Sequence, residues 1–399
     1  MILKKNILMI SQGTFPPDIR LEKEIKSLSE AGYKVLVVCN QYDRQLNPVY
    51  ESCEIIRVKA LFKSQRLNRI INFPIFFNPR FLLLVFKSII KFKAGFIHAH
   101  DLPMVPIALF FGKLFHLPVI FDMHENYPAA LRFFNKRGVI NKLFKNPKLA
   151  GILEKLCLKW SDEIIVVVDE SKYRLLELGV EESRVHIISN TADLEQSHYP
   201  SIQISERQTE LNELSEKKVL LYTGRVSIER GLDTAILAME ILQRRVPDAI
   251  LLIVGDGEYV STLSNLAKKN ELEKAVKLID WPGQENLSFF FKVASICIIP
   301  QPQNDFINTT IPHKLFEYML QEKPVLTSDA IPLERILKET NCGLCFKSND
   351  PEHFAKVAEE ILLSKIPFGV NGVKAVHEKY NWANDSKVLI QLYKDLDYV

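Results

Sequence analysis

The segment from Tyr222 to Gly231 carries residue types suited to handling a charged leaving group. It leaves an apolar run, turns at Gly224 and holds Arg225 and Arg230 five residues apart. Two guanidinium groups placed there can hold a diphosphate and stabilise the negative charge that grows as the diphosphate leaves. A solvated loop with two surface arginines is the alternative, and the segment alone does not decide between the two.

A second segment, residues 308–325, offers another way to bind phosphate. Pro312 suits the first turn of a helix and Thr310 can cap it, so the helix would present N–H groups and the positive end of its dipole to an anion. Two turns on, Glu317 is offset toward the same side, where a carboxylate can accept both hydroxyls of a ribose. The alternative for Glu317 is an ion pair with a lysine on the helix surface.

Histidines and carboxylates gather in two further places, His98-Ala-His100-Asp101 and Phe121-Asp-Met-His-Glu125. Such groups at strand ends can hold zinc or iron for hydrolysis. His98 and His100 share one face of their strand, so only one or two of these side chains would point into a cleft. The lone Cys342–Cys345 pair lacks partners at zinc-site spacing. We expect no metal and no other cofactor.

Short apolar runs alternate with helical stretches along the chain, which predicts parallel sheets covered on both faces. The expected strands are residues 6–10, 34–39, 95–99, 118–122, 163–168 and 184–189, then 219–223, 249–254, 276–280, 295–299, 323–327 and 342–346. The clearest helix runs from Asp18, as N-cap, to Ala31, with Gly32 as its stop.

A polar stretch without strand signals interrupts this alternation after Asn190, which predicts a domain boundary. We expect a first domain over 1–192, a linker over 193–216 and a second domain over 217–379, with a C-terminal helix at about 380–399 completing the first. The carboxyl ends of the strands in two such domains would surround a shared cleft, where ligands bind.

The two segments first described resemble those of glycosyltransferase family 4, a set of retaining enzymes with the GT-B fold of two Rossmann-like, doubly wound domains facing across a cleft. Gly224-Arg225 followed by Glu229-Arg230-Gly231 is similar to the element whose basic pair holds the donor diphosphate in this family. Lys314-Leu-Phe-Glu-Tyr-Met319 is similar to its nucleotide-ribose helix. The resemblance covers nearly the whole chain.

In the first domain, the loop Gly13-Thr-Phe-Pro-Pro-Asp-Ile-Arg20 resembles the loop that approaches the donor. By the same resemblance, His124 orients the transferred sugar, while Arg20, His100, Asp101 and Glu125 line the acceptor cleft. The resemblance also assigns donor binding to the glycine turn Gly255-Asp-Gly257 and to Lys314. We further expect Asn308, Thr309 and Thr310 to contact the donor sugar, although the chain departs from the family pattern there.

Two positions depart from the family pattern. Arg230 stands where lysine is usual, which keeps the charge but replaces a point charge with a planar fork. Thr309 stands where the family has the first of two glutamates, near the donor sugar. We expect a variant subgroup that contacts the sugar through hydroxyl and amide groups; a weakened active site is the alternative.

The charge is distributed unevenly along the chain. Residues 1–160 hold 25 basic and 11 acidic side chains, whereas the remainder holds 26 and 37. Residues 62–96 and 131–149 contain no acidic residue and mix basic with apolar ones, as a surface for anionic lipid does. A soluble anionic acceptor is the alternative. We expect no nucleic acid as a partner, because no sequence motif typical of a nucleic-acid-binding domain accompanies the charge. We expect a cytoplasmic protein, attached peripherally to the inner face of the membrane.

The resemblance implies a retaining glycosyltransferase, with Arg225, Arg230, Glu317 and His124 as its catalytic residues. The donor would be a UDP- or GDP-linked sugar, and the acceptor a glycan or lipid-linked molecule in the assembly of cell-surface polysaccharide or glycolipid. Two alternatives stay open. One is a sugar-nucleotide epimerase, and the other is a catalytically silent nucleotide-sugar-binding partner subunit, which Thr309 would favour.

Overall fold

The computed structural model describes residues 5–41, 52–59, 78–134, 146–194, 213–283 and 286–397. The chain forms two compact units, with residues 1–190 and 383–399 in unit 1 and residues 191–382 in unit 2. Residues 62–77 and 135–145 of the predicted basic segments, and 195–212 of the predicted linker, lie outside the described residues.

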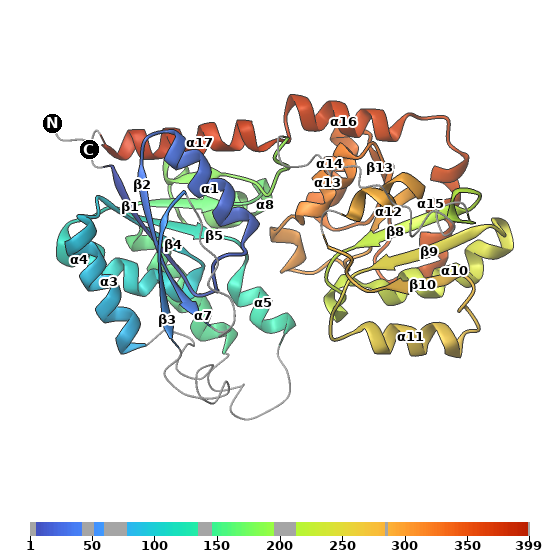
Figure 1. The fold of residues 1–399 in the computed structure, drawn as a ribbon, viewed down its shortest axis with the longest axis horizontal. Coiled ribbons are helices and arrows are strands. Elements are labelled where there is room, and N and C mark those ends of the chain that lie inside the picture. The colour runs from blue at the N-terminus through green and yellow to red at the C-terminus, as the bar shows by residue number, and fades with distance from the viewer. Residues whose placement is uncertain are drawn as a thin grey trace. The chain divides into compact units, whose positions relative to one another are not determined.

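Unit 1 contains a parallel sheet of seven strands in the order β3-β2-β1-β4-β5-β6-β7 (Figure 1). The central strands are buried throughout, because helices cover both faces and apolar side chains therefore occupy successive positions. The bounds are β1 Asn6–Ser11, β2 Lys34–Gln41, β3 Glu54–Lys59, β4 Phe96–His100, β5 Val119–Met123, β6 Glu163–Val166 and β7 Val185–Ile187.

The sequence did not predict β3. This strand lies at the edge of the sheet and pairs only with β2 among the described residues. Its residues, Glu54-Ile-Ile-Arg-Val-Lys59, include three charged side chains, and only Val58 is fully buried, so they lack the apolar run by which the other strands were recognised.

The helices of unit 1 begin and end where local chemistry directs. Helix α1, Ile19–Glu30, has the predicted N-cap, because the Asp18 side chain accepts the N–H groups of Arg20 and Leu21. The others are α3 Pro79–Phe92, α4 Val105–Phe115, α5 Tyr127–Phe133, α7 Pro147–Trp160 and α8 Asp169–Glu177, with the short 3₁₀ turns η1 Leu102–Met104 and η2 Glu182–Arg184.

The C-terminal helix α17, Trp382–Asp397, packs on unit 1 from residue 383 onward. Leu389, Leu392, Tyr393 and Leu396 are buried, and the Tyr393 ring meets Phe96 edge-on at 5.3 Å between centroids. The predicted return of the last helix to the first domain is confirmed.

Unit 2 contains a parallel sheet of six strands in the order β10-β9-β8-β11-β12-β13. Its strands are β8 Lys218–Thr223, β9 Ala249–Val254, β10 Val276–Ile279, β11 Ala294–Ile299, β12 Val325–Ser328 and β13 Gly343–Phe346. Two Rossmann-like parallel sheets therefore exist as predicted.

The helices of unit 2 surround this sheet. They are α10 Leu232–Arg245, α11 Val260–Lys269, α12 Leu287–Val293, α13 His313–Leu320, α14 Ile331–Thr340, α15 Pro351–Leu363 and α16 Phe368–Glu378, with 3₁₀ turns η3 Ile228–Arg230 and η5 Ile307–Thr309. In the described part of the chain, no helix has the length and apolar character needed to cross a bilayer.

Candidate functional site

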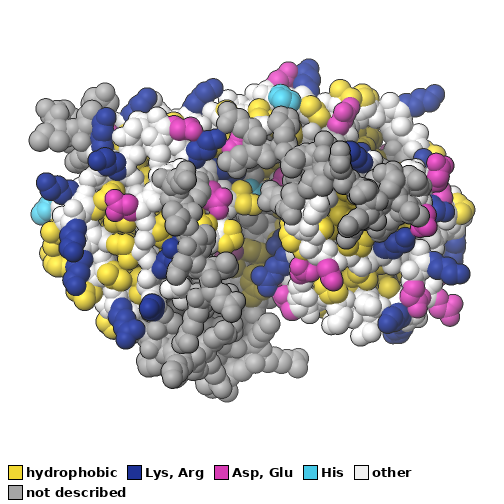
Figure 2. Space-filling model, viewed as in Figure 1, with side chains coloured by type: hydrophobic (Ala, Val, Ile, Leu, Met, Phe, Trp, Pro, Cys, Tyr) yellow, Lys and Arg dark blue, Asp and Glu magenta, His cyan; other side chains and the backbone are white. Residues whose placement is uncertain are grey.

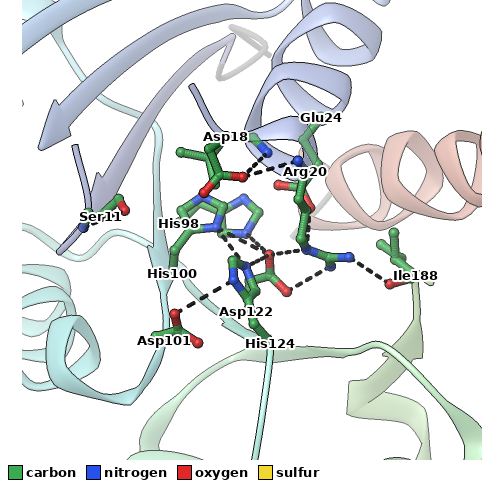
Figure 3. Close-up of polar contacts among 12 residues, drawn as sticks. Ser11, Asp18, Arg20, Glu24, His98, His100, Asp101, Asp122, His124 and Ile188 are labelled. Carbon is green, nitrogen blue, oxygen red and sulfur yellow. Dashed lines mark hydrogen bonds and ion pairs between the residues drawn. The ribbon is translucent and has the colours of Figure 1, made fainter. Parts of the chain in front are cut away.

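Asp122, at the end of β5, is the centre of a buried polar network in unit 1 (Figure 3). Arg20 holds both carboxylate oxygens, with Nε 3.0 Å from Oδ2 and Nη2 2.9 Å from Oδ1. Oδ2 also lies 2.9 Å from Nε2 of His124 and 3.2 Å from Nδ1 of His100. Burial would raise the pKa of Asp122, but the charges of Arg20 and His124 outweigh it and hold the pKa well below its ordinary value.

Arg20 is buried, and the other groups around it are also from unit 1. Its Nη1 donates to the carbonyl of Ile188 at 3.0 Å and to Oδ1 of Asn190 at 3.2 Å, and its Nε lies 3.1 Å from Oε1 of Glu24. Burial, followed by repulsion from Asp122, raises the pKa of Glu24 to about 8, so this carboxyl holds its proton at neutral pH. Arg20, predicted to line the acceptor cleft, thus holds Asp122 in place from the buried side of the network.

His98 and His100 lie side by side on β4 with their rings stacked at 4.4 Å between centroids. Both are buried. Burial and the neighbouring His100 lower the pKa of His98 to about 4, and burial lowers that of His100 as well. The hydroxyl of Tyr393 on α17 lies 2.8 Å from Nδ1 of His98, so the last helix orients this pair.

His124 is the half-buried member of the network, with 23% of its side chain exposed. Burial would lower its pKa, but Asp101 and Asp122 outweigh it and raise the pKa to about 10. Nδ1 lies 3.6 Å from Oδ2 of Asp101, which has a φ of 67°, a strained value for a residue other than glycine. Burial and Asp101 raise the pKa of Glu125 to about 7. An imidazolium and two carboxyl groups therefore meet at the accessible edge of this network.

Glu24, His98, His100 and Asp122 have side-chain atoms within 4.8 Å of one another, close enough to hold a metal ion. In this structure the guanidinium of Arg20 already supplies positive charge to Asp122. The alternative metal site considered from the sequence, with His98, His100, Asp101 and His124, differs from this cluster by two members.

In unit 2, Lys314 lies where β8 ends. Its Nζ donates to the carbonyl of Thr223 at 2.8 Å and stands 3.7 Å from the centroid of the Tyr222 ring. Loss of hydration, reinforced by the charge of Arg230 and opposed by Glu317, lowers the pKa of Lys314 well below its ordinary value. Lys314, Arg230 and Glu317 therefore share one electrostatic environment.

Arg230 closes the 3₁₀ turn η3, and Gly231 follows with a φ of 65°. A side chain at 231 would place its Cβ 2.1 Å from the carbonyl oxygen of Pro300, so only glycine fits. The Nε of Arg230 is buried and has no hydrogen-bond partner among the residues that the structure describes. A bound anion would accept a hydrogen bond from this buried N–H group and would favour the charged form of the neighbouring Lys314.

Arg225 lies on the same loop but points to a different partner. It is 67% exposed and pairs with Glu258 at 3.0 Å. The loops after β8 and β9 meet closely, because a Cβ at Gly255 would fall 1.8 Å from the carbonyl oxygen of Gly224 and one at Gly257 would fall 1.8 Å from that of Val226. These predicted glycines let two strand ends approach.

Residues 308–310 lie at and after η5. Oδ1 of Asn308 accepts the N–H of Ile331 at 3.1 Å, at the start of α14. The hydroxyl of Thr309 lies 3.0 Å from both carbonyl oxygens of Asp305 and Phe306 and donates within its own turn. Helix α13 begins at His313 with Pro312 as its N-cap, and no side chain of the described residues caps it, so the predicted capping by Thr310 is wrong. Thr310 instead follows η5 in extended backbone.

The structure brings the predicted residues together in two sets. Unit 1 joins Arg20, His100, Asp101, His124 and Glu125, while Gly13 lies beside Ser11 at the end of β1. Unit 2 joins Arg230, Lys314 and Glu317. Sequence reasoning missed Glu24 and Tyr393, and it gave no separate role to Asp122 and Tyr222, which stand in the segments it singled out. Glu24 follows Arg20 by one helical turn, a spacing that signals a pair on one face.

Two family profiles match consecutive parts of the chain. The profile described as Glycosyltransferase Family 4 matches residues 21–196, and the one described as Glycosyl transferases group 1 matches residues 203–369. An uncharacterized glycosyltransferase of Methanocaldococcus jannaschii is 26% identical over 45% of each protein, so the match spans less than half of that relative's length. The UDP-Gal:alpha-D-GlcNAc-diphosphoundecaprenol alpha-1,3-galactosyltransferase of Escherichia coli is 21% identical over 74% of this chain and 73% of its own.

Solved structures share the fold over almost all of the chain. Sucrose-phosphate synthase from Thermosynechococcus elongatus superposes with a TM-score of 0.78 at 18% identity, covering 98% of this chain and 99% of the other. Anabaena HepE in complex with UDP-glucose superposes with a TM-score of 0.70 at 15% identity, covering 98% and 99%. At these identities the likeness concerns the fold.

Proposed function

Because the chain belongs to the group 1 and family 4 glycosyltransferases, we propose that it transfers a sugar from a nucleoside diphosphate sugar to an acceptor hydroxyl. The family is retaining, so the product keeps the anomeric configuration of the donor. UDP is the first nucleotide to test, because the solved structure of HepE holds UDP-glucose; GDP is the second.

One observation carries this proposal: the buried Nε of Arg230, without a hydrogen-bond partner in the described part of the chain, lies near Lys314, whose positive charge is suppressed. A diphosphate would accept from both groups and restore the proton of the lysine. Glu317 would accept the ribose hydroxyls, and the N-terminus of α13 would add backbone donors.

In the proposed reaction, the bond between the anomeric carbon and the diphosphate oxygen breaks, and the acceptor oxygen forms the new bond on the same face. The proton of the acceptor hydroxyl passes to an oxygen of the departing diphosphate. Arg230 and Lys314 stabilise the growing negative charge, and the cationic His124 orients the sugar. Arg225, which here pairs with Glu258, would have to leave that partner to contribute.

For the acceptor we propose a glycan or a lipid-linked molecule in cell-surface polysaccharide or glycolipid assembly. The E. coli relative is named for a diphosphoundecaprenol-linked substrate, which supports an acceptor held at a membrane. The basic, acid-free segments 62–96 and 131–149 also suit a protein attached to the inner face of the membrane, where it would meet such a substrate.

Replacing Arg230 tests the donor site. We expect Arg230→Ala to lower diphosphate release from the best donor of a UDP-, GDP- and ADP-sugar panel by about 100-fold or more, the cost of removing one preorganised donor. Arg244→Ala is the control, because Arg244 is an exposed arginine on α10. Unchanged release in Arg230→Ala, with an unchanged melting temperature, would remove the diphosphate assignment.

A catalytically silent nucleotide-sugar binder is the second candidate. Thr309 favours this candidate, because it stands where the family carries a glutamate and its hydroxyl donates to the nearby carbonyl oxygens of Asp305 and Phe306. Thermal stabilisation by UDP without diphosphate release from any donor, with or without acceptor, would support the silent binder over the enzyme.

A further inference from the structure

Helix α3 of unit 1 exposes large apolar side chains at helical spacing. Leu83 and Ile90 are each 52% exposed and Phe86 is 38% exposed, although large apolar side chains are usually buried in the protein core. Basic side chains stand beside them on the same exposed stripe, at Arg80, Lys87 and Lys91. The stripe is thus apolar and cationic together.

Helices α7 and α4 repeat this pattern. On α7, Leu149, Ile152, Leu156 and Trp160 are 49–59% exposed, and Lys148, Lys155 and Lys159 alternate with them. On α4, Phe110 is 63% and Leu114 54% exposed, with exposed Lys113 between them.

The three helices form one continuous surface, which we call the α3–α4–α7 face. The ring of Phe86 on α3 lies 5.8 Å from that of Phe115 on α4, and Nζ of Lys113 on α4 lies 5.5 Å from the ring of Trp160 on α7. Each helix connects strands that advance in one direction across the sheet, so right-handed crossovers put all three on the same side. In the space-filling view, basic and hydrophobic side chains are interspersed over the region where the ribbon view, from the same side, labels α3 and α4 (Figures 1 and 2).

The charge of this face has one sign. Helices α3 and α4 contain no aspartate or glutamate, and Glu154, the single acidic residue of α7, is buried and paired with Arg174. A second copy of the chain would bring cation against cation here. A soluble polyanion would use the lysines but leave the apolar side chains in water. An anionic bilayer satisfies both, because its phosphates attract the lysines and its acyl boundary takes the apolar groups.

A hollow adjoins the face where α7 begins. It has a volume of about 660 Å³ and is lined by four basic residues, Arg132, Lys148, Lys155 and Arg174, and by one acidic residue, the paired Glu154. Such a pocket has the charge and size to receive the headgroup of an anionic lipid.

We propose that the α3–α4–α7 face docks unit 1 on an anionic phospholipid bilayer. This docking face rests on the proposed function, which supplies an acceptor held at the membrane. It extends the basic segments 62–96 and 131–149 to a folded surface, because it also includes α4 and Trp160, which lie outside those segments. Docking is therefore measured as binding, separately from turnover.

Flotation of the full chain with phosphatidylcholine vesicles, with and without phosphatidylglycerol, tests the proposal. We expect binding that needs phosphatidylglycerol and weakens as salt is added. Lys87→Glu/Lys91→Glu should weaken it at least about 25-fold, since each basic residue near such a surface contributes about fivefold. Leu83→Gln/Ile90→Gln should weaken it at least about tenfold.

Matched changes in unit 2 serve as controls. Lys268→Glu/Lys269→Glu reverses two exposed charges on α11, and Leu237→Gln/Leu363→Gln replaces two exposed leucines; both should bind as the wild type does. Binding equal to wild type in the α3 variants, equal binding without phosphatidylglycerol, or capture by soluble heparin but not by vesicles would overturn the docking face. Diphosphate release that persists when docking fails leaves the proposed function standing, and docking without release leaves the docking face standing.

Discussion

Glu24 shows how burial keeps a carboxyl group in its neutral form. Its pKa rises from an ordinary 4.5 to about 8, so the folded protein keeps a proton that the unfolded chain loses. Where the folded state binds more protons, stability falls as pH rises. Glu24 therefore destabilises unit 1 progressively from about pH 4.5 to pH 8.

Replacing this carboxyl should flatten the pH dependence of stability. We expect the melting temperature of Glu24→Gln, relative to that of the wild type, to increase between pH 5 and pH 8.5. Comparing the two proteins at each pH cancels His124, which lowers stability from about pH 6.5 to pH 10 in both, and His98, which acts in the opposite sense below pH 6.5. A difference in melting temperature that stays constant with pH would contradict the assignment.

We expect Lys314 to take up a proton when a nucleotide binds. Its pKa lies well below the ordinary value in the empty site, and a diphosphate beside it would raise that pKa. UDP should therefore bind with net proton uptake at alkaline pH, and its affinity should fall as pH rises. Calorimetry in buffers of different ionisation enthalpy measures the uptake, which Lys314→Met should abolish and Lys269→Met should leave unchanged.

The approach of the loops after β8 and β9 gives a prediction for the elements of unit 2. A Cβ at Gly257 would fall 1.8 Å from the carbonyl oxygen of Val226, so Gly257→Ala must push the two loops apart. We expect about 1–3 kcal/mol of lost unfolding free energy and weaker UDP binding. Gly151→Ala, where the added Cβ meets nothing within 4 Å, is the control: it should leave UDP binding unchanged and, as an alanine inside α7, should not lower the melting temperature.

The sequence predicted the strands well because most are buried on both sides and read as apolar runs. The edge strand β3, half polar, gave no such signal. Helix α1 followed from its cap and its glycine stop. The site was predicted unevenly: His100, Asp101 and His124 end adjacent strands and meet as strand order requires, whereas Tyr393 reaches His98 from nearly 300 residues along the chain, and no local pattern encodes that contact.

At the scale of the whole molecule, α17 should decide whether unit 1 folds. It buries Leu389, Leu392, Tyr393 and Leu396, and about 1.5–3 kcal/mol for each such side chain approaches the total stability of a domain. A chain ending at Trp382 should lose the cooperative unfolding of unit 1 and expose it to protease. Unit 2 keeps all its residues and should still be stabilised by UDP. Protection of both units in limited proteolysis would contradict this.

Because residues 191–382 are enclosed within the sequence of unit 1, this protein cannot complete its units in the order in which they are translated. The sheet of unit 1 leaves the ribosome first but lacks helix α17, whose Tyr393 contacts His98, until residues 383–397 have been translated. Unit 2 has all its parts earlier and can finish first. A nascent chain would therefore hold an unfinished N-terminal half until α17 has emerged, the interval in which it most needs protection by a chaperone.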